Sequence, residues 1–177
     1  SLSAETANST TPNIVLIFID DMGYADIGPF GNKDLSTPHL DKFAAEGRKF
    51  TSFYATPVCS MSRASLMTGC YNVRVSIPGV LFPKSKIELN PDEVTLAEAL
   101  KPAGYVSASV GKWHLGDGPE HDPTSQGFDV NVAGYGAGSP PSYFTPYKIP
   151  TLPDGPPRAY LTDRRTTEAC RLLPAQR

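Results

Sequence analysis

The feature that most constrains the fold is a short apolar run that ends at two acidic residues. Residues 13–19 read Asn-Ile-Val-Leu-Ile-Phe-Ile, and Asp20 and Asp21 follow directly. A continuous run of this kind is typical of a strand buried on both faces, as in a parallel sheet covered by helices. Ligands bind beyond the carboxyl ends of such strands, which is where the two aspartates fall. The run therefore predicts an α/β fold with a ligand site near Asp20 and Asp21.

Further strands and helices are expected to alternate along the 177 residues, which favours the same class of fold. Helix starts are read from proline and from Thr-x-x-Glu capping pairs, and helix ends from glycine. The expected elements are a helix from Pro38 to Gly47, a strand over 50–54, a helix over 62–68 closed by Gly69, a helix capped by Thr95 and Glu98, a strand over 105–110, and a helix from Thr162 through Leu173.

Two segments are expected to lack regular structure. Residues 1–12 are polar and aperiodic, and we expect a disordered tail there, followed by one domain over 13–177. Residues 139–157 contain seven prolines and are expected to form an extended loop. The polar start without methionine fits a mature chain whose export signal has been removed, and it fits a trimmed chain equally well. We expect a periplasmic or secreted protein.

Charge and hydropathy exclude two classes of partner. The net charge is −2, with acidic and basic residues mixed along the chain, so no basic surface for nucleic acid is expected. The longest apolar run is far too short to cross a bilayer, so no membrane partner is expected. Three cysteines leave at least one thiol unpaired, and a bridge between Cys70 and Cys170 is the one pairing considered.

Three short motifs carry the candidate chemistry. Asp20 and Asp21 offer oxygen ligands of the kind that Ca²⁺ or Mg²⁺ prefers, unless they only cap a turn and face solvent. Cys59 and Arg63 lie four residues apart around an expected helix start, where unsatisfied amide groups favour a nucleophile or an anion. Cys59 could instead be a small buried hydrophobe. The guanidinium of Arg63 offers paired donors suited to a tetrahedral anion.

The third motif is Gly-Lys-Trp-His-Leu-Gly at residues 111–116, which follows the strand expected over 105–110. It would bring Lys112 and His114 to the end of the sheet. The alternative is a solvated lysine and a histidine bonded to backbone. A zinc site from His114, Asp117, His121 and Asp122 is also conceivable, but their spacing does not match the usual helical histidine pair.

Together these motifs resemble the amino-terminal part of the sulfatase family. Cys59, Ser62 and Arg63 match its Cys-x-Pro-Ser-Arg motif, with Met61 where proline is usual. The resemblance implies an incomplete alkaline-phosphatase-like fold, a mostly parallel, mixed sheet flanked by helices. It also implies that Cys59 is oxidised to formylglycine by a formylglycine-generating or radical sulfatase-modifying enzyme. The modified residue is then expected to bind Ca²⁺, or Mg²⁺ in its place, together with Asp20 and Asp21.

The implied activity is hydrolysis of a sulfated carbohydrate or an aryl sulfate. In the family, residues matching Cys59, Arg63, Lys112 and His114 are catalytic, with Lys112 between sulfate and nucleophile and His114 taking a proton. Later family residues that complete the metal and sulfate sites have no match here, so we expect weak activity or none from this chain alone. The alternatives are a phosphoester or phosphonate hydrolase of the same superfamily, and a non-catalytic remnant that binds an anion.

Overall fold

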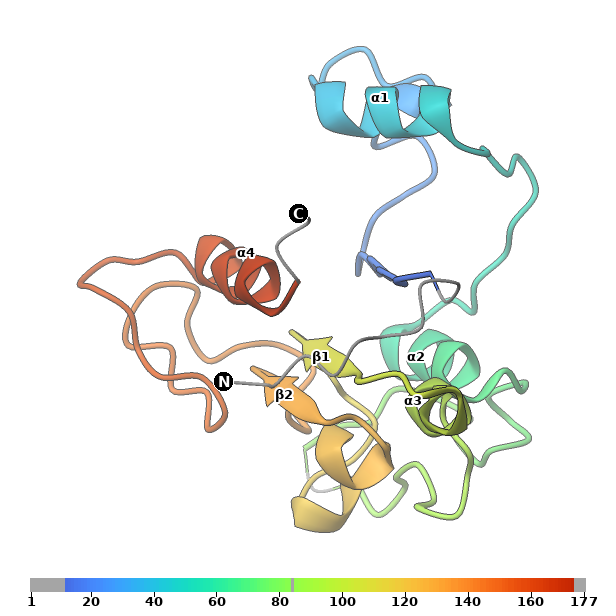
Figure 1. Cartoon of the computed structure of the whole chain (residues 1–177), viewed down its shortest axis with the longest axis vertical. Helices are drawn as coiled ribbons and strands as arrows, with labels where there is room; N and C mark the ends of the chain where they lie inside the picture. Colours follow the sequence, from blue (N-terminus) through green and yellow to red (C-terminus); the bar gives the residue numbers. More distant parts are fainter. Residues whose placement is uncertain (1–11, 84, 174–177) are drawn as a thin grey trace. The chain divides into compact units, whose positions relative to one another are not determined.

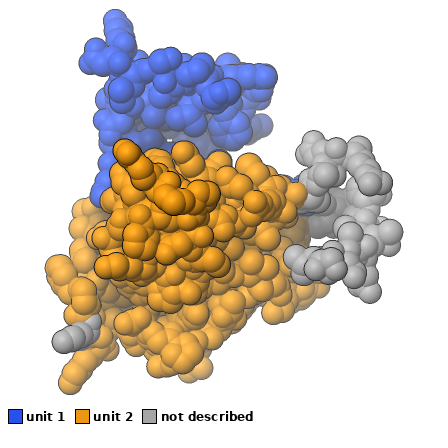
Figure 2. Space-filling view, turned by 90° about the vertical axis from the view of Figure 1, so that its left-hand side faces the viewer, with its two compact units in different colours: residues 1–55 blue, residues 56–177 orange. Residues whose placement is uncertain are grey.

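The computed structural model describes residues 12–83 and 85–173, and these divide into two compact units. Unit 1 comprises residues up to Ala55 and unit 2 begins at Thr56, and Figure 2 colours them separately. The tail expected over residues 1–12 lies, except for Pro12, outside the described residues. No helix in the described ranges is both long enough and apolar enough to cross a membrane.

Unit 1 contains two helical elements and no strand within its described residues. The short 3-10 helix η1 spans Gly28–Phe30, and α1 spans Pro38–Glu46 with Gly47 at its end, as the sequence predicts. The strands expected over 13–19 and 50–54 do not form. Both predictions were wrong for these residues.

The physical reason is that these segments do not join a sheet and are not covered. A strand is stable only when its amide and carbonyl groups pair with a neighbouring strand and its side chains are covered. Within the described ranges, the sheet contains β1 and β2 alone, and the apolar side chains over 13–19 are exposed, with Ile17 at 77% and Val15 at 61%. None of the described residues of unit 1 is buried.

Unit 2 contains the remaining elements, which Figure 1 labels along the chain. They are α2 (Cys59–Thr68), α3 (Leu96–Leu100), η2 (Lys101–Ala103), β1 (Ala108–Val110), η3 (Pro119–His121), η4 (Pro123–Gln126), β2 (Val130–Val132) and α4 (Leu161–Leu172). Strands β1 and β2 pair in parallel, with Ala108 opposite Val130 and Val110 opposite Val132. Parallel strands with helices packed beside them are the α/β arrangement that the sequence predicts.

Two apolar clusters form the core of unit 2. The larger brings α2 together with the segments after it and after β1. The smaller lies between the end of β2, the proline-rich segment and the start of α4. The first comprises Ala64, Val75, Ile77, Leu81, Leu89, Trp113 and Leu115, and the second Ala133, Tyr147, Ile149, Leu152 and Leu161. Residues 139–157 contain no helix or strand and follow an irregular course.

Helix ends follow the sequence signals unevenly. Thr95 and Glu98 form the expected capping box at α3, with each side chain bonded to the other's amide. Gly69 ends α2 in the left-handed conformation that glycine adopts readily. Thr162, expected to cap the last helix, does not: α4 begins at Leu161 after Tyr160, which makes no side-chain cap bond.

Candidate active site

The amino-terminal turn of α2 carries the first two candidate residues. The helix begins at Cys59, three residues earlier than predicted, so Cys59 lies in its first turn rather than ahead of it. The Ser62 hydroxyl donates to the Thr56 carbonyl at 2.6 Å and thereby fixes the loop that enters the helix. Met61 is in the same turn, where amides have no intrahelical acceptor, so proline would fit there equally well. The departure from the family motif is conformationally neutral.

Cys59 faces His114, which comes from a segment 55 residues later. The Cys59 Sγ atom lies 3.3 Å from His114 Nδ1, and the hydroxyl of Ser60 lies at the same distance from that nitrogen. His114 Nε2 lies 2.6 Å from the carbonyl oxygen of Leu81. Because a carbonyl only accepts, Nε2 carries a proton, and in the neutral form of the ring the lone pair of Nδ1 faces Cys59.

His114 is held from several sides. It is 2% exposed, and its amide donates to the Tyr135 carbonyl. Its backbone φ of 59° lies in the left-handed region, which costs about 1 kcal/mol or more for a residue other than glycine. A Cβ added to Gly138 would lie 2.6 Å from the ring, so the backbone of Gly138 packs closely against the imidazole. The ring position is thus determined by its surroundings.

Arg63 and Lys112 meet through a main-chain contact. Arg63 Nη1 donates to the Lys112 carbonyl oxygen at 2.5 Å. Arg63 lies one helical turn after Cys59 on the same face of α2. Lys112 follows β1 by two residues, and the amide of Gly111 extends the β1–β2 pairing by donating to Val132. The structure thus gathers all four candidate catalytic residues at one place in unit 2.

Arg165 on α4 adds a second arginine that sequence reasoning missed. It is half-buried, and its Nε atom has no hydrogen-bond partner among the described residues. Burial lowers the pKa of Arg165, the charge of nearby Arg63 lowers it further, and Tyr135 and Tyr143 oppose this effect. Two neighbouring arginines favour an anion between or beside them. No local motif marks Arg165, because it comes from a helix that looks featureless in the sequence.

The candidate metal ligands lie in the other unit. Asp20 is partly buried and Asp21 is exposed with a φ of 56°, and both belong to unit 1, whereas Cys59 belongs to unit 2. Their carboxylates have the donor chemistry that a hard cation requires. Within the part of the chain that the structure describes, no three metal-ligating side chains gather as a metal site would need. The donor set fits Ca²⁺ in kind but falls short in number.

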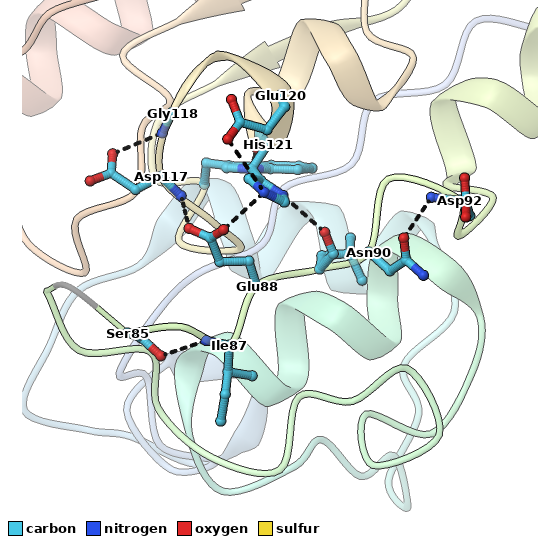
Figure 3. A network of polar contacts seen from close by, with 11 residues as sticks. Ser85, Ile87, Glu88, Asn90, Asp92, Asp117, Gly118, Glu120 and His121 are labelled. Atoms are coloured by element: carbon cyan, nitrogen blue, oxygen red, sulfur yellow. Dashed lines mark hydrogen bonds and ion pairs between the residues drawn. The ribbon is translucent and has the colours of Figure 1, made fainter.

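The residues considered for zinc are engaged separately. His121 donates from Nδ1 to the Leu89 carbonyl and pairs through Nε2 with Glu88 at 2.8 Å (Figure 3). Both ring nitrogens are thus occupied by protein acceptors. Asp122 accepts from Asn131 at 2.7 Å, and although that bond lowers its pKa, burial raises it more strongly. The zinc alternative is therefore not supported among the described residues. Cys59, Cys70 and Cys170 are all free thiols, so the disulfide considered between Cys70 and Cys170 does not form.

Comparison with known proteins gives a consistent family relationship. The profile described as Sulfatase matches residues 12–172. The chain is 51% identical over 122 residues to arylsulfatase A of Bos taurus, covering 68% of this chain and 24% of that protein. It is 43% identical over 154 residues to N-acetylgalactosamine-6-sulfatase of Homo sapiens, covering 82% of this chain and 28% of that protein. The chain therefore spans about a quarter of the length of these curated relatives.

A solved structure gives the same relationship in three dimensions. Ps i-CgsB, crystallised in complex with k-i-k-neocarrahexaose, superposes with a TM-score of 0.73 at 29% identity. The match covers 86% of this chain and 39% of that chain. The expected alkaline-phosphatase-like α/β fold, present here as an incomplete part, is confirmed by this likeness and by the parallel pair in unit 2.

Proposed function

We propose that this chain, which belongs to the sulfatase family, carries the nucleophile and part of the sulfate site of an enzyme that hydrolyses sulfate monoesters. The observation that carries the proposal is the 3.3 Å contact between Cys59 Sγ and His114 Nδ1, on a ring whose Nε2 donates to the Leu81 carbonyl. A buried base with a defined tautomer beside a group at a helix start is the arrangement that nucleophilic catalysis requires. The contact between Arg63 and Lys112 adds cations to the same place.

Residue 59 is proposed to act as formylglycine, formed when a dedicated modifying enzyme oxidises the thiol to an aldehyde. Hydrated, that group supplies two hydroxyls, one to attack sulfur and one whose proton loss lets sulfate leave. His114 is the residue that accepts this proton, because its Nδ1 lone pair faces residue 59 while Nε2 stays bonded to Leu81. Since the ring is fixed, the proton transfer needs no rearrangement.

Arg63 and Lys112 are proposed to hold the sulfate. Negative charge on the transferring group is stabilised best by cations already in position before reaction. Arg63 is anchored by its bond to the Lys112 carbonyl, so its remaining guanidinium donors have a defined direction. Arg165 strengthens the positive field at Arg63 from a different helix. This surplus of positive charge favours an anionic substrate over a neutral one.

A Ca²⁺ ion, for which Mg²⁺ could substitute, is proposed to bind Asp20, Asp21 and residue 59. Bound there, it would polarise the nucleophile and an oxygen of the sulfate. Ca²⁺ takes six or more oxygen ligands, so two aspartates and one modified residue leave it short of ligands unless water or further donors complete the site. For this reason the 177-residue chain alone is expected to be weakly active or inactive.

The substrate is proposed to be a sulfated carbohydrate or an aryl sulfate. The names of the relatives support both classes, since one is an arylsulfatase and another acts on N-acetylgalactosamine 6-sulfate. The neighbour bound to a carrageenan-type hexaose supports the carbohydrate. Periplasmic or secreted location remains part of the proposal, and cell fractionation tests it.

Peptide mass spectrometry tests the modification. Cleavage after Lys49, Arg63 and Arg74 separates Cys59, in residues 50–63, from Cys70, in residues 64–74. In protein made by cells with a modifying enzyme, the first peptide is expected to exchange its sulfur for an aldehyde oxygen, while the second keeps its thiol as an internal control. An intact thiol at Cys59 in active protein would contradict the proposed nucleophile.

Turnover of 4-nitrophenyl sulfate, measured for this chain and for a version extended by the carboxyl-terminal part of a sulfatase relative, tests the activity. Cys59→Ala is expected to lower kcat by about a thousandfold or more, and His114→Ala by about a hundredfold or more. Cys70→Ala removes another half-buried thiol and is expected to retain turnover. Preference for 4-nitrophenyl phosphate would favour the phosphoester hydrolase, and no turnover of either ester would favour the non-catalytic remnant.

A further inference from the structure

Two side chains, Glu88 and His121, join the segments that lie before and after the Gly-Lys-Trp-His-Leu-Gly motif. Glu88 Oε2 lies 2.8 Å from His121 Nε2, and these side chains are only 26% and 14% exposed, respectively. The other oxygen of Glu88 accepts from the Asp117 amide at 2.9 Å, and Figure 3 shows the carboxylate between that amide and the histidine ring. His121 Nδ1 lies 3.1 Å from the Leu89 carbonyl oxygen. The two segments are thus connected by three polar contacts.

The residues on both sides of His114 are bound to this connection. Before it in the chain, the indole Nε1 of Trp113 donates to the His121 carbonyl at 2.7 Å. After it, the Leu115 carbonyl accepts from the Leu89 amide at 2.8 Å, and the carbonyl of Leu89 is the group that faces the ring of His121. The course of the chain through His114 is therefore fixed from Leu89 and His121.

Close packing at Gly116, the last residue of the motif, adds to these bonds. A Cβ added there would lie 2.5 Å from the Cβ of His121 and 3.3 Å from the Cβ of Glu88. Real Cβ atoms do not approach as closely as the first of these distances, so only glycine lets the backbone pack against both side chains. Glu88 and His121 thus touch the end of the motif by packing as well as by hydrogen bonding.

We propose that Glu88 and His121 are positioning residues for His114, which hold the chain around it so that Nδ1 faces residue 59. The inference rests on the proposed role of His114 as the base and adds two residues from outside the sequence motifs. The backbone of His114 has a φ of 59°, a strained conformation that persists only where its surroundings hold it. A displacement of about 1 Å at a reacting group can lower a rate about a hundredfold. Loss of the pair is therefore expected to weaken the contact between His114 and residue 59.

The 177-residue chain with an unmodified Cys59 allows a test that needs no turnover. Iodoacetamide alkylation of Cys59 is followed by mass spectrometry of the peptide over 50–63, and Cys70 in the peptide over 64–74 is the internal reference. His114→Ala is expected to slow alkylation of Cys59 at neutral pH, because the thiolate is the reactive form and the ring accepts the thiol proton. Glu88→Ala is expected to slow it in the same way, about threefold or more, and to leave Cys70 unchanged.

Three further variants separate positioning from a general effect of charge. Glu120→Ala removes an exposed carboxylate 3.9 Å from the same nitrogen of His121 and is expected to change neither cysteine. Glu88→Gln keeps an acceptor for the Asp117 amide and is expected to retain most of the reactivity of Cys59. Glu88→Ala combined with His121→Ala is expected to be no slower than the slower single variant, because both substitutions remove one shared contact.

Failure of this inference is distinguishable from failure of the proposed function. If His114→Ala slows Cys59 and Glu88→Ala does not, the positioning role is wrong. Faster alkylation of both cysteines in Glu88→Ala also overturns it, because the pair would then only support the fold. If His114→Ala leaves Cys59 unchanged, the assignment of His114 as the base falls, and this inference falls with it.

Turnover by the extended version provides the catalytic readout. Glu88→Ala is expected to lower kcat for 4-nitrophenyl sulfate about tenfold and to change KM less than about twofold, because it displaces the base and leaves Arg63 and Lys112 in place. An equal loss of kcat in Glu120→Ala would contradict the positioning role. Absence of turnover by wild type would overturn the sulfatase proposal, while the alkylation rates would still decide whether the pair positions His114.

Discussion

Both units of this chain contain apolar side chains, but among the described residues only unit 2 buries them. In unit 1, six consecutive apolar residues from Ile14 to Ile19 are exposed, and none of the described residues is buried. In unit 2, thirteen apolar residues are buried, and twelve of them form two clusters drawn from segments around α2, β1, β2 and α4.

 The two units therefore differ in how far other parts of the chain cover their apolar side chains. An apolar run becomes a strand only where other backbone and side chains are available to pair with and cover it.

The largest expected effect contrasts one core residue with one exposed residue. Leu115 in unit 2 is fully buried, so Leu115→Ala is expected to lower the free energy of unfolding by about 2–5 kcal/mol. Phe53 in unit 1 is 79% exposed, so Phe53→Ala is expected to change it by less than about 0.5 kcal/mol. Urea unfolding followed by fluorescence of Trp113, the single tryptophan, reports on unit 2. Circular dichroism reports on both units.

Equal destabilisation by Phe53→Ala and Leu115→Ala would contradict this difference between exposed and buried side chains. Such a result would mean that the apolar side chains of unit 1 are covered in solution. A second exposed position provides the control: Ile17→Ser is expected to leave the urea midpoint unchanged, because Ile17 is 77% exposed.

Local signals in the sequence predicted helices better than strands. The ends of α1 and α2 at Gly47 and Gly69, and the capping box of Thr95 and Glu98, depend on neighbouring residues alone and were confirmed. The strands expected over 13–19 and 50–54 depend on distant partners, which no local pattern specifies. The start of α2 was placed too late, because Val58 makes no side-chain cap and the entry loop is fixed by Ser62 and Thr56 instead.

The candidate site follows the same rule. Cys59 and Arg63 could be paired from their four-residue spacing, and Lys112 and His114 from the end of a strand. The Leu81 carbonyl, which defines the tautomer of His114, could not be predicted, since main-chain groups carry no sequence signal. Arg165 was missed for a related reason: only the packing of α4 beside β1 brings it near Arg63.

A smaller effect compares one glycine in each unit. In unit 2, a Cβ on Gly138 would lie 2.6 Å from the His114 ring, which cannot move without losing its hydrogen bonds, so Gly138→Ala is expected to cost about 1–3 kcal/mol. In unit 1, a Cβ on Gly23 would meet only the exposed side chain of Asp26 at 3.0 Å, and rotation of that side chain gives up one exposed hydrogen bond from the Gly23 amide. Gly23→Ala is therefore expected to cost less, about 0.5 kcal/mol. Thermal unfolding of both variants checks the difference, and equal losses would contradict it.

Two threonines at helix starts sharpen the comparison further. Thr95 is fully buried, accepts from the Glu98 amide and donates to the Gln126 carbonyl, so Thr95→Ala is expected to cost about 1–2 kcal/mol. Thr37 precedes α1 without capping it and accepts instead from the Gly28 amide. Thr37→Ala is expected to cost less, about 0.5 kcal/mol, because its bond from Gly28 is only partly buried and its bond to Asp41 is long and exposed. Urea midpoints that fall in the reverse order would show that unit 1 is the more tightly held.

The smallest expected effect is a pH dependence in unit 2. Burial raises the pKa of Asp122 above its ordinary value, and the hydrogen bond from Asn131 opposes that shift. A raised pKa in the folded state means that Asp122 contributes stability below its unfolded pKa and loses it as pH rises through the folded value. Solvent screening keeps this contribution below about 0.5 kcal/mol. In wild type, the urea midpoint is expected to fall slightly as pH rises from about 3 to about 6, and Asp122→Asn is expected to reduce that fall. The exposed control Asp92→Asn is expected to leave the pH dependence of the midpoint unchanged. A midpoint that instead rises more steeply with pH in wild type than in Asp122→Asn would mean that the bond from Asn131 outweighs burial, and that this part of unit 2 is more open to water than its neighbours.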